Sequence, residues 1–410
     1  SMKQIDPAPR YNARDSAIVL ANYFNAKVIL GTATPAVETY YNTEKQKFGL
    51  VKLEKRFGGM EMPEIEVANI KQETKWQRMQ GSFTSQLVNE VSLALKNKEQ
   101  VILFLNRRGF ANYQTCKTCN HVYKCKNCDV SLTYHKFSHQ LKCHYCGYFE
   151  KVVDRCKICG AIDLDIVGMG TEKIEDEIPL YLPNVKVARM DVDAVRTKHG
   201  HNKLIQDFEE QKIQVLVGTQ MVTKGLDFDH VSLVGIMSAD QLINHSDFRA
   251  AERAYQLMEQ VKGRAGRKNK QGKVVIQTNN TRYAVLNYLK QNDFEGFFEN
   301  ELEQRKRFAY PPFTRLIHVQ LKHKHKETVS ASAHWFSSEL INKIGERLLG
   351  PAEPPISKIK NLFLMDLILK LEKNQNFIHQ TKVLLQSLQE QMKLNAKFRS
   401  TIVEVDVDPM

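Results

Sequence analysis

Eight cysteines are the residues of this 410-residue chain whose spacing points most directly to chemistry. They form four Cys-x-x-Cys pairs, which are Cys116 and Cys119, Cys125 and Cys128, Cys143 and Cys146, and Cys156 and Cys159. A two-residue gap lets both thiolates of a pair reach one tetrahedral ion at about 2.3 Å, and eight thiolates make two closed four-sulfur sites. We therefore predict two structural zinc ions. Redox-active pairs are the alternative, but four consecutive pairs in one short insert do not favour them.

The spacing does not decide how the four pairs combine. In a nested order, the first pair joins the fourth around one ion, and the second pair joins the third around the other. In a sequential order, the first pair joins the second, and the third joins the fourth. Both orders give two closed sites without an open position for water, so both predict a structural role.

A loop rich in small and polar residues suits contacts with phosphate groups. Residues 217–228 lead from an apolar segment into this loop, which contains Thr219, Lys224, Gly225 and Asp227. Hydroxyl groups and backbone N–H groups in such a loop can bind phosphate, and the carboxylate can orient a neighbouring side chain. We interpret the loop as a phosphate-binding element.

The sharpest motif is a pair of arginines at the end of a predicted helix. Gln260, Gly263, Arg264 and Arg267 follow one another there, and the glycine allows close approach to a ligand. Two arginines three positions apart are suited to stabilise the charge of a transferring γ-phosphoryl group. The alternative is a basic helix end that complements the helix dipole.

Two other loops contain side chains that could contact nucleic acid. Residues 31–35 form a Gly-Thr-Ala-Thr-Pro turn, in which the hydroxyls of Thr32 and Thr34 could relay hydrogen bonds. An ordinary helix cap is the simpler explanation of this turn. Arg107 and Arg108 follow a predicted strand and could hold a phosphate, or could lie in a solvated turn.

The elements that must position these residues alternate between short apolar strands and helices. We expect strands at residues 101–105, 186–190, 215–217, 231–236 and 273–277, and helices at 84–96, from about 171, at 203–210 and at 247–261. This alternation predicts a parallel sheet covered by helices on both faces, with the cysteine block inserted into it. Sheets of this kind bind ligands at their strand ends.

The two ends of the chain have different patterns. Residues 27–30 are expected to form a strand between two helices, and a parallel strand needs neighbours. We therefore expect residues 1–60 to be the edge of a larger domain, with apolar surface exposed within residues 13–48. Residues 310–410 follow the order β-α-β-β-α-β, which predicts a split βαβ domain of the α+β class.

These patterns divide the chain into six segments. They are residues 1–60, a linker at 61–82, the first part of the sheet domain at 83–112, the zinc-binding insert at 113–162, the second part of the sheet domain at 163–309, and the C-terminal domain at 310–410. The formal charge of +13 favours a polyanionic partner, although many soluble proteins are as basic. With no stretch of about 20 apolar residues, we expect a cytoplasmic protein.

Several of these motifs together resemble a known family. Residues 32–34, 218–225 and 260–267 resemble motifs III, V and VI of superfamily-two helicases. The cysteine block narrows the resemblance to the primosomal replication-restart (PriA-type) helicases, and further similar segments are 106–109, 168–172, 247–253, 310–313 and 406–409. The resemblance covers the chain from Lys3. It implies a RecA-like second helicase lobe, a remnant of the first lobe at residues 1–60, and the nested zinc order.

The resemblance also implies a function. Such proteins are bacterial ATP-dependent 3′-to-5′ DNA helicases that use Mg²⁺, act on stalled or branched forks, and bind single-stranded DNA, single-stranded-DNA-binding protein and the primosome proteins that load the replicative helicase. It places Gln260, Arg264 and Arg267 against ATP, with residues 218–227 and Thr32 to Thr34 coupling ATP to DNA. It matches Arg10, Tyr11 and Arg14 to the end of a DNA-sensing loop.

Departures from the family pattern limit these expectations. The chain has no Gly-x-x-x-x-Gly-Lys-Ser/Thr segment and no Asp-Glu-x-His segment, which the family uses for phosphates and magnesium (the Walker A and B motifs). We therefore expect this C-terminal part to be inactive as an ATPase alone. Residues 361–366 are more apolar and acidic than the basic stretch expected for DNA contact. The rival hypotheses are a non-catalytic zinc-ribbon nucleic-acid-binding protein and an interaction scaffold of the primosome.

Overall fold

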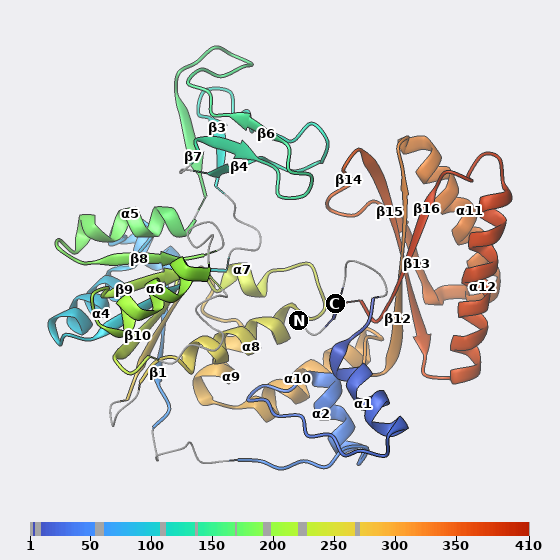
Figure 1. The fold of residues 1–410 in the computed structure, drawn as a ribbon, viewed down its shortest axis with the longest axis horizontal. Helices are drawn as coiled ribbons and strands as arrows, with labels where there is room; N and C mark the ends of the chain where they lie inside the picture. Colours follow the sequence, from blue (N-terminus) through green and yellow to red (C-terminus); the bar gives the residue numbers. More distant parts are fainter. Residues whose placement is uncertain are drawn as a thin grey trace.

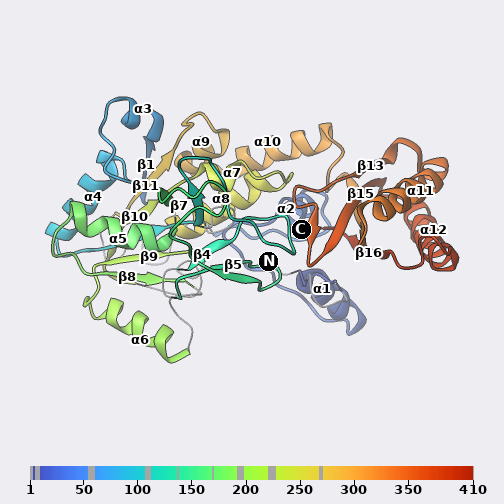
Figure 2. The same cartoon turned by 90° about the horizontal axis from the view of Figure 1, so that it is seen from above.

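The computed structural model of the chain describes residues 3–4, 10–53, 61–106, 112–135, 138–168, 170–191, 198–219, 228–266 and 271–409. A central α/β domain, a cysteine-rich insert above it, two N-terminal helices below it and a C-terminal domain beside it make up the molecule (Figure 1). The central and C-terminal domains lie at opposite ends of the long axis (Figure 2). None of the helices within the described ranges is long and apolar enough to span a membrane.

The central domain is built on a six-stranded parallel sheet. Its strands, in spatial order, are β1 (Glu64–Asn69), β11 (Lys273–Thr278), β10 (Val231–Ile236), β2 (Gln100–Phe104), β9 (Val215–Gly218) and β8 (Val187–Met190). The inner strands are continuous apolar runs because helices bury both of their faces. The five strands expected from the sequence are all confirmed.

Helices cover both faces of the sheet. Helices α4 (Ser85–Lys96) and α5 (Thr171–Tyr181) pack on one face, and α6 (Lys198–Glu209), α8 (Ala250–Lys262) and α9 (Ala284–Gln291) pack on the other. Shorter helices α3 (Ile70–Lys75) and α7 (Asp240–Ile243) follow strand ends, and α10 (Phe294–Arg307) leads away to the C-terminal domain. Side chains alternate along each strand, so Leu103 packs against α4 while Phe104 belongs to the opposite core.

The sequence analysis missed the edge strand β1. Residues 61–82 were expected to be a linker, whereas the structure pairs β1 with β11 along its whole length. Two of the six residues of β1 are glutamates, so the sequence has no continuous apolar run there. An edge strand does not need apolar residues where it faces solvent. Glu66 is stabilised there because its carboxylate lies 2.8 Å from the ammonium group of Lys273.

The cysteine-rich insert leaves the central domain and returns to it through one antiparallel ribbon. Strand β3 (Tyr113–Cys116) pairs with β7 (Leu164–Val167) to form this ribbon. Three short strands, β4 (Thr133–His135), β5 (Gln140–Lys142) and β6 (Phe149–Lys151), form a small sheet beyond it. The insert therefore interrupts the parallel sheet without displacing any of its strands.

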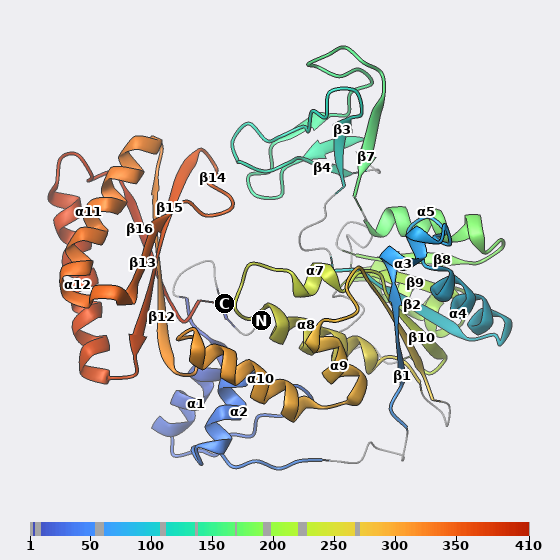
Figure 3. The same cartoon turned by 180° about the vertical axis from the view of Figure 1, so that it is seen from behind.

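The C-terminal domain has the expected split βαβ arrangement. Its elements are β12 (Thr314–His323), α11 (Lys326–Ile344), the 3₁₀ turn η3 (Gly345–Arg347), β13 (Leu348–Ala352), β14 (Lys358–Ile359), β15 (Leu362–Glu372), α12 (Gln375–Leu394) and β16 (Ile402–Val407). The antiparallel sheet has the order β13-β15-β12-β16, and both helices cover one face (Figure 3). The second main strand is β13, whereas residues 356–360 contribute only the short hairpin strand β14.

The N-terminal part consists of α1 (Ala13–Tyr23) and α2 (Val37–Glu44), beside α10. Residues 27–30 form no strand, so that prediction was wrong: a parallel strand needs a neighbour, and these residues instead lie exposed, with Ile29 95% exposed. The expected apolar surface is present on this part of the chain. It comprises Val19, Leu20, Tyr23, Phe24, Val28, Ile29 and Leu30.

This apolar surface predicts self-association of the isolated chain. Helix α1 buries none of its side chains, and contiguous exposed apolar area favours contact with another such surface. We expect the weight-average mass to rise across micromolar concentrations in analytical ultracentrifugation. Replacing Tyr23, Phe24 and Ile29 with serine should restore a monomer, whereas a strictly monomeric unmodified chain would contradict the prediction.

Candidate metal centres and motor-site residues

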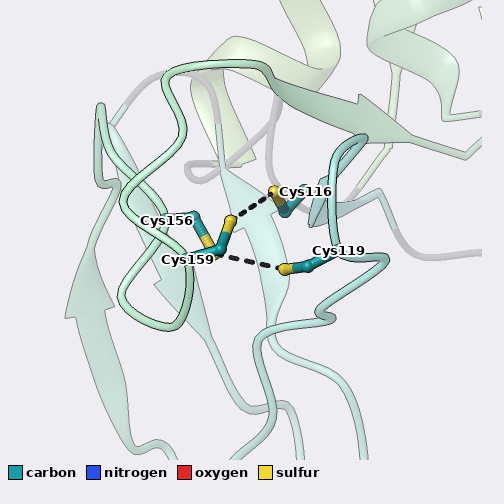
Figure 4. A group of neighbouring side chains, drawn as sticks. All are labelled: Cys116, Cys119, Cys156 and Cys159. Atoms are coloured by element: carbon teal, nitrogen blue, oxygen red, sulfur yellow. Dashed lines mark hydrogen bonds between the residues drawn. The ribbon is translucent and has the colours of Figure 1, made fainter.

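The structure gathers the eight cysteines into two groups of four. The outer cluster, Cys116, Cys119, Cys156 and Cys159, and the inner cluster, Cys125, Cys128, Cys143 and Cys146, each have all sulfur atoms within 4.8 Å of one another. In the outer cluster the Cys116 and Cys159 sulfurs are 3.6 Å apart, and those of Cys119 and Cys156 are 3.7 Å apart (Figure 4). Sulfurs bound to one tetrahedral zinc at about 2.3 Å lie about 3.8 Å apart, so the cysteines fit zinc.

The order of the clusters is nested, because strand pairing decides which turns meet. Cys116 ends β3 and pairs with Leu164 at the start of β7, which brings the first and fourth Cys-x-x-Cys turns together. The small sheet β4-β5-β6 brings the second and third turns together in the same way. The geometry agrees with the order that the family resemblance implied.

The turns also place backbone N–H groups beside several of the sulfurs. Three backbone N–H groups each donate a hydrogen bond of 3.4 Å to a cysteine sulfur. The pairs are Asn127 with Cys125, Tyr148 with Cys146, and Ile158 with Cys156. Backbone N–H groups of Cys159 and Ile158 lower the pKa of the Cys156 thiol, which favours its thiolate form. The thiolate is the form that binds zinc.

The described ends of the two predicted phosphate-binding segments lie near the start of β10. The backbone N–H of Gly266, just after α8, donates a hydrogen bond of 3.0 Å to the carbonyl of Val231, and Phe228 lies three residues before that carbonyl. Gly266 has a φ of +80°, and a Cβ at Gly272 would lie 2.3 Å from its nitrogen. Glycine is therefore required at both positions.

The individual motor candidates have different surroundings. Thr219 is buried at the carboxyl end of β9, Gln260 is exposed near the end of α8, Gly263 caps that helix, and Arg264 is half-buried beyond it. Of the candidates that the structure describes in these segments, only Thr219 thus lies at the carboxyl edge of the sheet, where we expected ligand sites. The remaining candidates in these segments lie outside the described residues, namely Arg107, Arg108, Lys224, Gly225, Asp227 and Arg267.

The Thr32 to Thr34 turn lies next to the start of α8. The backbone N–H of Thr34 donates a hydrogen bond of 3.1 Å to the hydroxyl of Thr32, which makes the turn a local cap. Directly after it, the N–H of Val37 donates to the Glu252 carboxylate on α8, at 2.9 Å. This hydrogen bond places the turn beside α8. Among the described residues, neither threonine side chain forms a hydrogen bond with that helix.

The N-terminal candidates for DNA contact are engaged within the protein. Arg10 forms an ion pair with Glu404 of β16, and Arg14 donates a hydrogen bond of 2.7 Å to the hydroxyl of Thr39. Tyr11 is 45% exposed. These contacts bring Arg10 towards the C-terminal domain and Arg14 towards α2, rather than towards the end of α8.

A buried ionic network joins three parts of the molecule, and the sequence analysis missed it. Glu252 of α8 and Arg305 of α10 are 3% and 2% exposed and lie 2.8 Å apart. Glu38 of α2 lies 2.5 Å from Arg249 and 3.2 Å from Arg305, and Glu301 lies 3.5 Å from Arg305. The available sequence pattern was the i,i+3 pair of Arg249 and Glu252, which looks like an ordinary surface pair.

Charge attraction keeps this network ionised. Burial opposes ionisation of Glu252, but the nearby guanidinium groups of Arg305 and Arg249 outweigh it and lower the pKa of Glu252. Burial raises the pKa of Glu301, which lies at the edge of the network. Arg305 also donates a hydrogen bond of 3.4 Å to the carbonyl of Pro311, at the start of the C-terminal domain.

This combination of fold and site defines the second lobe of a helicase motor, followed by a separate C-terminal domain. The model of the helicase conserved C-terminal domain matches residues 166–269. The model of the PriA DNA helicase Cys-rich region matches residues 125–151, and the model of the primosomal protein N C-terminal domain matches residues 306–410. The chain belongs to the PriA family of replication restart proteins.

Curated relatives are similar over nearly the whole chain. It is 35% identical to the replication restart protein PriA of Bacillus subtilis, over all of this chain and 50% of that protein. It is 37% identical to PriA of Rickettsia felis over 92% of this chain and 58% of that protein, and 35% identical to PriA of Haemophilus influenzae over all of this chain and 55% of that protein. The chain spans about half the length of these relatives.

Solved structures are less similar. Dbp5 of S. cerevisiae bound to RNA and ADP BeF3 aligns at 13% identity with a TM-score of 0.36, over 73% of this chain and 60% of that one.

Double substitutions distinguish the nested from the sequential zinc order. We expect two zinc ions per chain by metal analysis, because each cluster supplies four thiolates. Cys119→Ser with Cys156→Ser should leave one ion, since both cysteines belong to the outer cluster. The matched control, Cys119→Ser with Cys143→Ser, should leave none. A sequential order requires the opposite result for the first variant, because it would damage both sites.

Removing one charge from the buried network should destabilise the protein strongly. In Glu252→Gln the paired arginines lose their most buried partner, and breaking such a pair costs roughly 3–5 kcal/mol. We expect a clear loss of urea resistance, followed by tryptophan fluorescence with zinc present. Glu210→Gln removes an exposed partner of Lys212 and should change little. Equal stability of the two variants would show that the network is dispensable.

Proposed function

We propose that this chain supplies the second motor lobe, the zinc insert and the C-terminal domain of an ATP-dependent 3′-to-5′ DNA helicase for replication restart. The observation that supports this proposal is the hydrogen bond from the Gly266 N–H to the Val231 carbonyl, because Gly266 belongs to segment 260–267 and Val231 follows segment 217–228 by three residues. We infer that segments 217–228 and 260–267 approach one another near this hydrogen bond. They contain the hydroxyl, glycine and arginine groups suited to a nucleotide phosphate.

In this proposal Gln260, Arg264 and Arg267 approach ATP, with Arg264 and Arg267 stabilising the charge on the transferring phosphoryl group. Gly225, Asp227 and Gly263 belong to the same nucleotide-facing surface. ATP and Mg²⁺ need further ligands, because the sequence has no phosphate-binding glycine loop of the Gly-x-x-x-x-Gly-Lys-Ser/Thr type.

Helix α8 connects the proposed nucleotide-facing surface to the buried ionic network. Its start holds Glu252 in the buried network with α2 and α10, and its end leads into the arginine segment. A 13-residue helix spans about 20 Å, so it fixes the distance between the two regions. Thr32, Thr34, Thr219 and Lys224 would couple nucleotide binding to DNA, and Arg10, Tyr11, Arg14, Arg107 and Arg108 would contact DNA phosphates.

The partners that we propose are branched and single-stranded DNA, single-stranded-DNA-binding protein, and the proteins that load the replicative helicase. The formal charge of +13 supports a polyanionic partner. The zinc ions stabilise the insert and take no part in hydrolysis, because a site closed by four cysteines has no position for water. A scaffold that binds DNA and primosome proteins without a motor is the competing function.

ATP hydrolysis separates these functions. We expect no turnover by this chain alone, with or without branched DNA, because it lacks a phosphate-binding loop. In the whole-length protein, Arg264→Ala or Arg267→Ala should lower hydrolysis by roughly 10³-fold, the lower bound for an arginine finger. DNA affinity should persist, and Arg282→Ala, an exposed arginine outside the site, serves as the matched control. Full unwinding by both arginine variants would favour the scaffold.

A further inference from the structure

The hairpin formed by β14 and β15 reaches out of the C-terminal domain and contacts the cysteine-rich insert. The backbone N–H of Asp129 donates a hydrogen bond of 2.9 Å to the Lys358 carbonyl, and the N–H of Asn361 donates one of 2.8 Å to the Asn127 carbonyl. Figures 1 and 3 show the hairpin pointing from the C-terminal domain towards the insert. Two regions separated by more than 200 residues are thus joined backbone to backbone.

The contact includes a ligand sulfur of the inner cluster. The backbone N–H of Lys360 donates a hydrogen bond of 3.2 Å to Cys128 Sγ. Lys360 and Asn361 have φ values of 51° and 63°, a two-residue turn of the kind that hairpins prefer, which points this N–H outward. A hydrogen bond to a thiolate offsets part of its negative charge and stabilises the metal-bound form.

Apolar packing surrounds this hydrogen bond. Ile359 packs against the insert core, which includes Tyr123, Leu132 and the inner cysteines. Cys128 is 2% exposed, whereas Cys119 and Cys159 of the outer cluster are both exposed. The inner cluster is therefore shielded, and it receives a hydrogen bond from another domain.

We propose that the inner zinc site is shared between the insert and the C-terminal domain, so that zinc binding and docking of the hairpin are one coupled equilibrium. The hairpin supplies the Lys360 N–H to Cys128 and covers the site with Ile359. In return, the zinc-bound turn at residues 125–128 presents the Asn127 carbonyl and the Asp129 N–H to the hairpin. Loss of the inner zinc releases the hairpin, and loss of the hairpin weakens the inner zinc.

The coupling has a structural consequence for the insert. The insert is attached to the central domain through the β3–β7 ribbon, and the hairpin contact gives it a second attachment. The position of the insert relative to the C-terminal domain then depends on one metal ion. The outer zinc, which has exposed ligands, serves as an internal reference in the same molecule.

The test places a charge at the apolar contact without touching a zinc ligand. Ile359→Asp should undock the hairpin because its carboxylate would be buried against the insert core. Zinc transfer to a chromophoric chelator should then show an inner site roughly 10-fold weaker or more, the usual cost of removing a hydrogen-bond partner of a ligand. The outer site should be unchanged. Ile341→Asp, at an exposed isoleucine of α11, is the matched control.

Hydrogen exchange supplies an independent measurement. In the zinc-loaded protein the amides of Asp129, Lys360 and Asn361 should exchange slowly, and Ile359→Asp should expose all three. Strands β12 and β15 should stay protected, which shows that the domain remains folded; Ile359→Ser is the milder variant if they do not. In the reverse direction, Cys143→Ser should remove the inner zinc and expose the Asn361 amide. Unchanged inner-zinc affinity in a variant whose Asp129, Lys360 and Asn361 amides have become exposed would overturn the proposal.

Discussion

The arrangement of the motor lobe depends on a few charges that have been removed from water. Glu252 and Arg305 are almost fully buried, and a buried charge is tolerated only where an opposite charge lies close and its hydrogen-bonding groups are occupied. Arg249, Glu38 and Glu301 complete that environment. Because each of these residues comes from α2, α8 or α10, or from the residue before α8, the network permits little change in how those helices meet.

Helix α8 extends this constraint towards the proposed nucleotide surface. Its first turn is held by the network, and its end passes into Gly266, whose backbone is packed against Gly272 and bonded to Val231. There is no room for a side chain at Gly272, and the positive φ of Gly266 disfavours one there. The backbone of the arginine segment is thus held in place at Gly266. The hairpin joins the C-terminal domain to the insert, and Arg10 joins it to the N-terminal part.

The features that were predictable from the sequence are those encoded within one segment. The buried strands of the sheet are continuous apolar runs, and Cys-x-x-Cys turns indicate zinc whatever surrounds them. Features that depend on distant partners were missed or left open. The nested cysteine order follows from the pairing of β3 with β7, β1 becomes a strand only beside β11, and residues 27–30 lack any such neighbour. Arg305 lies in a basic run that looks solvent-exposed until its three carboxylate partners are known.

Because of the β3–β7 ribbon, the insert adds little loop-closure entropy cost to the parallel sheet that contains it. Since the chain departs and returns on adjacent strands, the entropy of closing the long excursion is confined to the ribbon and to the metal-bound turns. For the parallel sheet, the insert is therefore equivalent to a short connection between β2 and α5. A change in the length of the insert beyond the ribbon would therefore leave the register of the six parallel strands the same.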